Sequence, residues 1–164
     1  MLALTVAALA AFSFACVAQA GDIADNQYQG RVEKTPGSYF GFNVKKQHGV
    51  KRVKRVAAYL PYHCRGQTEP LRVYSEADGS LKLKPDGSFA GKLKATQFLG
   101  RGGTGPRGTY ELEGKIGDNG VAKGRIDANL RVNQARARGG SSLRCYSGGL
   151  DWKAKEGAEV GLPG

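Results

Sequence analysis

Apolar residues recur at every second position through most of this 164-residue chain, and helical spacing is rare. A period of two is typical of β-strands with one buried and one solvent-facing side. The step of three from Val53 to Val56 predicts a β-bulge in the strand that leads to Cys64. The pattern also predicts a short strand at Leu71 and Val73. Further side chains are expected to point into the core: Tyr28, Gly30, Val32, Phe40, Phe42 and Val44 early in the chain, and Leu143, Cys145, Leu150 and Trp152 late in it.

Two hairpins are predicted in the middle of the chain. Pro85-Asp86-Gly87 and Asp118-Asn119-Gly120 each fit a three-residue loop whose glycine takes positive φ. In the first hairpin apolar side chains alternate with Lys82, Lys84, Lys92 and Lys94, which we expect on the outer face. In the second, Glu113 is expected opposite Arg125, also outside.

Two segments rich in Gly or Arg, Gly100–Gly108 and Arg131–Arg138, are predicted as loops. Nine or ten strands with short turns and no helix predict an all-β fold, either an antiparallel up-and-down barrel or a two-sheet sandwich. Trp152 follows Cys145 by seven residues, and we interpret it as a core side chain that could pack on a disulfide.

The first twenty residues predict export. Met1–Ala20 carries no charge, contains an apolar run from Leu2 to Val17, and ends in Ala18-Gln19-Ala20, which fits a signal-peptidase site. The run is too short for a membrane span, so no transmembrane anchor is expected. Lipid anchoring at Cys16 is not expected, because the residues before it fit a lipoprotein motif poorly. We therefore expect a secreted protein with a signal peptide at 1–20 and a single β domain at 21–164.

Two cysteines, Cys64 and Cys145, would remain after cleavage. Because exported proteins mature in an oxidising compartment, the pair predicts one disulfide.

The residues that could carry catalysis form no recognisable constellation. Gly103–Gly108 matches G-x-G-x-x-G in letters, but a strand rather than a helix is expected to follow, so no nucleotide cofactor is predicted. His48, His63 and Cys64 lack the spacing of a metal site. Surface pairing accounts for Glu111 and Glu113. These observations favour a noncatalytic protein, although carboxylates or a Ser-His pair brought together by folding would be invisible in sequence.

Charge is the most informative chemical feature. The chain holds 25 Lys and Arg against 14 Asp and Glu, a net charge of +11, which favours acidic partners. One predicted hairpin concentrates six cations around His48, and we predict that they bind anions: Lys45, Lys46, Lys51, Arg52, Lys54 and Arg55. Aromatic residues for base stacking are sparse there, so specific nucleic-acid binding is not expected.

The order of motifs resembles that of small exported single-domain β proteins common in actinobacteria and related bacteria. The resemblance rests on Phe42-Asn43-Val44, Cys64, Asp86–Phe89, Tyr110–Gly114, Gly120–Ile126, and Cys145 followed by Trp152. It implies export and a β fold, and it assigns no functional residue.

The leading hypothesis is an exported noncatalytic β domain, expected to be a monomer, that binds an anionic polymer or an acidic surface at the cell envelope or outside. A barrel that carries a small apolar ligand is the alternative, and an open interior would favour it. A hydrolase with a site invisible in sequence is the second alternative.

Overall fold

A computed structural model describes residues 26–99, 103–133 and 142–157, with the side chains of 96–99, 103–106 and 133 left aside. The predicted signal peptide, Cys16 and most of the predicted 131–138 loop lie outside the described residues. No helix in the described ranges is long and apolar enough to cross a membrane.

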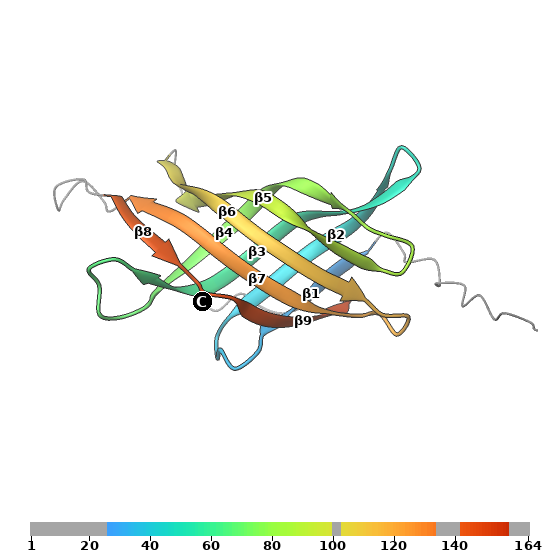
Figure 1. The fold of residues 1–164 in the computed structure, drawn as a ribbon, viewed down its shortest axis with the longest axis horizontal. Helices are drawn as coiled ribbons and strands as arrows, with labels where there is room; N and C mark the ends of the chain where they lie inside the picture. Colours follow the sequence, from blue (N-terminus) through green and yellow to red (C-terminus); the bar gives the residue numbers. More distant parts are fainter. Residues whose placement is uncertain (1–25, 100–102, 134–141, 158–164) are drawn as a thin grey trace, which may run out of the picture.

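The described chain is all-β, as predicted, and forms one antiparallel sheet of nine strands. The strands are β1 (Gln27–Val32), β2 (Tyr39–Gln47), β3 (Val50–Cys64), β4 (Leu71–Lys82), β5 (Ser88–Leu99), β6 (Gly103–Ile116), β7 (Val121–Asn133), β8 (Ser142–Tyr146) and β9 (Leu150–Glu156). Neighbours pair in the order β2-β1-β9-β7-β6-β5-β4-β3-β8, and β2 also pairs with β3. The sheet therefore closes into a barrel (Figure 1), while the short β8 bridges β3 and β7 at one end.

Three strands are longer than the sequence pattern predicts. The segment expected as a short strand at Leu71 and Val73 continues without a break into the strand of Lys82, and Leu71 itself is exposed. The predicted loops at Gly100–Gly108 and Arg131–Arg138 are also too wide, because β6 begins at Gly103 and β7 runs to Asn133. Glycine and arginine weakened the apolar alternation there, yet residues 103–108 and 131–133 pair with neighbouring strands.

The predicted bulge and both predicted turns are confirmed. β3 carries one extra residue against β2, since Gly41 and Asn43 pair with Ala57 and Lys54, and Arg55 within this step has φ 51°. The register of β3 against β4 also shifts between Lys54 and Val56, with the extra residue there on β4. Gly87 and Gly120 have φ 79° and 70°, as a three-residue hairpin loop requires. The register Gly114↔Gly124 and Glu113↔Arg125 is also as predicted.

Aromatic rings fill one end of the barrel interior. Trp152 is 1% exposed and its ring centroid lies 4.4 Å from that of Phe40, 5.8 Å from Phe42 and 6.2 Å from Phe89. Gly114 and Gly124 leave room for the indole, since a Cβ on either would lie 2.6 or 2.5 Å from its Cζ2 atom. The interpretation that Trp152 packs on the disulfide is wrong: Trp152 pairs with Gly124 and Cys145 with Leu130, six residues further along β7 and so about 20 Å away.

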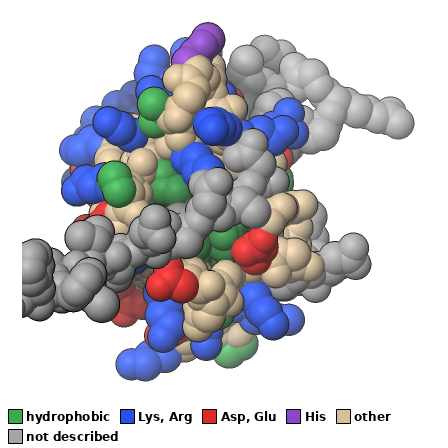
Figure 2. All heavy atoms as spheres, turned by 90° about the vertical axis from the view of Figure 1, so that its right-hand side faces the viewer, with side chains coloured by type: hydrophobic (Ala, Val, Ile, Leu, Met, Phe, Trp, Pro, Cys, Tyr) green, Lys and Arg blue, Asp and Glu red, His purple; other side chains and the backbone are tan. Residues whose placement is uncertain are grey.

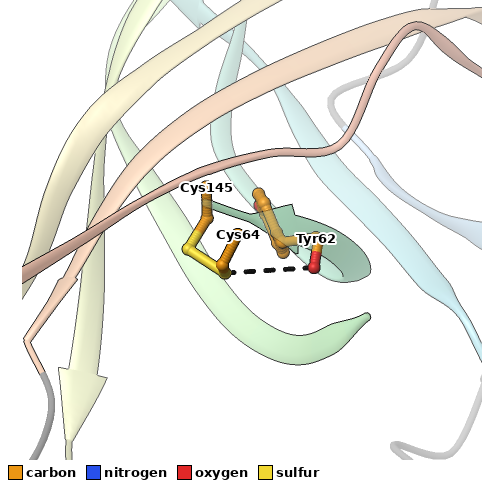
Figure 3. Close-up of a disulfide and its surroundings, with 3 residues drawn as sticks. All are labelled: Tyr62, Cys64 and Cys145. Atoms are coloured by element: carbon orange, nitrogen blue, oxygen red, sulfur yellow. Dashed lines mark hydrogen bonds between the residues drawn. A yellow bond between two sulfur atoms is a disulfide. The ribbon is translucent and has the colours of Figure 1, made fainter. Parts of the chain in front are cut away.

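A buried disulfide, drawn in Figure 3, lies away from these rings. Cys64 and Cys145 are bonded and are directly opposed in β3 and β8, with Cα atoms 4.0 Å apart. The neighbouring Arg65 N–H donates to the Arg144 carbonyl, so the cysteines occupy a pair without backbone hydrogen bonds, where side chains come closest. The Sγ atom of Cys64 lies 4.0 Å from the carbonyl oxygen of Tyr62.

A buried polar cluster lies nearby. The Ser75 hydroxyl sits between those of Tyr62 and Tyr110, and the Tyr110 hydroxyl donates to the Ser75 carbonyl at 3.1 Å. Burial raises the pKa of Tyr62 to about 12 and raises that of Tyr110 strongly. All three side chains are fully buried, so the cluster satisfies polar groups inside the barrel.

Candidate anion-binding surface

The six predicted site residues lie on or beside one hairpin, formed by β2 and β3. His48 and Gly49 form its two-residue turn, with φ 49° and 78°, and Gln47 pairs with Val50. Positive φ at both positions defines a type I′ turn, whose twist matches that of paired strands. The hairpin projects beyond the other strands at the upper right of Figure 1.

Three cations form a row across β2, β3 and β4. Lys45 pairs with Arg52, and Arg52 pairs with Lys82 on its other side. Directly paired residues share a face of the sheet, so the three side chains lie next to one another on the outside, with neighbouring strands about 4.8 Å apart. Lys54, between Asn43 and Ser80, continues the same outer face.

The remaining predicted residues surround this row. Lys46 and Lys51 are directly paired on the opposite face of the hairpin, beyond the buried pair Val44 and Val53. Arg55 occupies the bulge and is exposed. Figure 2, which looks at this end of the barrel, shows Lys and Arg side chains gathered over its upper left. We call the six predicted residues and Lys82 the hairpin patch.

Sequence reasoning missed Lys82. It placed this residue on the outer face of a different hairpin, which is correct, but Lys82 pairs with Arg52, which lies far from it in the sequence, at the start of β3. Local alternation predicts which face a side chain occupies, whereas non-local pairing decides which strand lies beside it. No sequence signal connected Lys82 to the hairpin patch.

An aromatic row lies further along the same three strands. Tyr39, Tyr59 and Tyr74 are paired across β2, β3 and β4 on the outside. Burial raises the pKa of Tyr39 and of Tyr74, and in Tyr74 a hydrogen bond donated to Glu76 at 2.8 Å adds to the shift. Because Tyr39 is only 8% exposed, the row does not present a free platform of stacked rings.

The other candidate residues are dispersed. His48 precedes β3 and His63 lies near its end, at most roughly 50 Å apart along a strand. No cluster of three or more His, Cys, Asp or Glu that could hold a metal occurs in the described part of the chain. Glu111 forms a salt bridge with Lys92 at 2.5 Å, whereas Arg125 pairs with Asp151 at 3.0 Å and not with Glu113, its cross-strand neighbour.

Comparison with known protein families, curated proteins and solved structures finds no match to this chain. The resemblance to exported bacterial β proteins therefore stays a prediction.

Proposed function

We propose that this protein is an exported, noncatalytic β domain that binds an acidic polymer or surface at or outside the cell envelope through the hairpin patch. The observation that carries the proposal is the outer row of Lys45, Arg52 and Lys82. Like charges directly opposed in a sheet destabilise it by about 0.2–1 kcal/mol per pair. The row therefore adds nothing to the folding stability of the protein. A bound anion would attract all three cations and so offset the repulsion between them.

Two ordinary explanations of surface charge fit this row less well. Cations often protect the free edge of a sheet, but Arg52 and Lys54 are paired on both sides, with β2 and with β4. Scattered solvated charge would alternate in sign along a face. The row instead repeats one sign across three strands.

The alternatives have less support. A carrier of a small apolar ligand needs interior space, and the packed rings of Phe40, Phe42, Phe89 and Trp152 fill one end of the described barrel interior. A hydrolase needs a nucleophile beside a base. Ser75 is buried between two tyrosine hydroxyls, and both histidines are exposed on β3 or its turn.

The test is elution from immobilised heparin. A Lys45→Glu, Arg52→Glu, Lys54→Glu variant is compared with a Lys34→Glu, Arg65→Glu, Arg144→Glu control, whose residues are exposed at the other end of the barrel. Each triple reversal lowers the net charge from +11 to +5 (three times −2). The hairpin variant should elute at clearly lower salt than the control. Equal elution of the two variants would mean that only net charge matters, and the proposal would be lost.

A further inference from the structure

A second line of like charge crosses the sheet on other strands. Lys115 pairs with Lys123, Lys123 with Lys153, and Lys153 with Arg31. This cationic row joins β6, β7, β9 and β1, and none of these strands carries a residue of the hairpin patch. Three steps between neighbouring strands give it a length of about 14 Å.

The four side chains are exposed and unneutralised. Each is open to solvent, and none forms a salt bridge with a carboxylate in the described ranges. The acidic residues on the adjoining outer positions are Glu33, Glu113 and Asp151, and Asp151 is already bonded to Arg125. Hydrogen bonds from Ser88, and then the charges of Lys115 and Lys84, lower the pKa of Asp86 in the adjacent turn. Because every member faces at least one like charge directly, folding alone disfavours the arrangement.

A shallow depression on the outer surface borders one end of the row. Its charged lining consists of Lys84, Lys115, Lys123 and Arg125 together with the carboxylates Glu113 and Asp151. Lys84 extends the line of charge, since its N–H donates to Ser88, and Ser88 pairs with Lys115.

We propose that the cationic row is a second polyanion track, independent of the hairpin patch. Its ligand is a flexible linear polymer that carries a phosphate or sulfate on each repeat and no aromatic base. A line of four charges suits a linear chain better than a single anion. No ring on which a nucleic-acid base could stack occupies the outer positions beside the row, which hold Gln29, Glu33, Lys155, Val121, Arg125, Glu113 and Asp151.

Calorimetric titration with short-chain inorganic polyphosphate tests the proposal by counting sites. The protein should bind two chains. A Lys115→Gln, Lys123→Gln, Lys153→Gln variant should bind one, with the remaining site unchanged, and a matched Lys34→Gln, Arg65→Gln, Arg144→Gln control should still bind two. Far-ultraviolet circular dichroism should show the row variant melting no lower than the wild type, because like-charge repulsion has been removed. A row variant that keeps every site would overturn the proposal.

Further arms identify the ligand. If the row accepts both sulfate and phosphate, heparin fragments should compete with polyphosphate for it. The polymer that binds with the lower dissociation constant then identifies the preferred acid group. Orthophosphate should bind at least roughly tenfold more weakly than the polymer, since it engages one cation and not a line. Comparable orthophosphate affinity, or tighter binding of oligo(dT) than of polyphosphate, would overturn the assignment. Loss of a site in the Lys45→Gln, Arg52→Gln, Lys54→Gln variant reports on the hairpin patch alone, so the two proposals fail separately.

Discussion

Removing the disulfide should cost this barrel a large part of its stability. The bond joins residues separated by 81 positions, and it therefore closes a loop that spans most of the described domain. In the chain-entropy model such a loop constrains the unfolded chain enough to stabilise the fold by about 4.5 kcal/mol. With an m-value of about 2 kcal/mol/M, that loss lowers the urea midpoint by about 2 M.

The assay is urea unfolding of three proteins: the oxidised wild type, the reduced wild type, and a Cys64→Ala, Cys145→Ala variant. The reduced protein keeps both sulfur atoms in the core, so its midpoint reports the cross-link alone. The alanine variant should unfold at a slightly lower urea concentration still, because both cysteines are buried and their removal leaves space in the core. A reduced wild type whose midpoint lies within about 0.3 M of the oxidised protein would refute the reasoning.

Further predictions concern the core and one surface pair. Gly114→Ala should lower the free energy of unfolding by about 1–3 kcal/mol, because the new Cβ would lie 2.6 Å from Trp152 Cζ2 and 2.8 Å from Phe89 Cζ. An unchanged urea midpoint would contradict the close packing of the indole against Gly114. Lys92→Ala should change stability by less than about 0.5 kcal/mol, since both partners of its salt bridge are exposed, and a larger loss in thermal unfolding would show a role that the structure does not explain. Burial raises the pKa of Tyr62 to about 12 from an ordinary value near 10, so the unfolded state loses this proton first and stability should fall between pH 10 and pH 12. Tyr62→Phe should reduce that alkaline loss in denaturation curves; an identical pH dependence would contradict the assignment.

Much of the fold could be predicted because each local signal was strong. The alternation around Phe40 and Phe42, the step from Val53 to Val56, and the turn glycines Gly87 and Gly120 each specify a backbone conformation or a face within a few residues. The cysteine pair had no alternative partner after the predicted cleavage. Closure of the sheet was not predictable, because it depends on the pairing of β1 with β9 and on the split partnership of β7.

The two candidate surfaces differ in how far the sequence could predict them. The six hairpin cations are neighbours in sequence, and so the hairpin patch could be predicted apart from Lys82. The cationic row could not, because Arg31, Lys115, Lys123 and Lys153 come from four strands that only the closed sheet brings together. Each of these residues alone has the features of an ordinary solvated lysine or arginine.

The salt dependence of heparin binding tests the central claim most directly. Each cation that contacts the polymer releases counterions, so the slope of log K against log salt counts the contacts at about 0.7 for each. The Lys45→Gln, Arg52→Gln, Lys54→Gln variant should therefore bind with a slope about 2 smaller in magnitude than the wild type. The Lys34→Gln, Arg65→Gln, Arg144→Gln control, with the same net charge, should keep the wild-type slope. Equal slopes for the two variants would contradict the assignment of the hairpin patch as the binding surface.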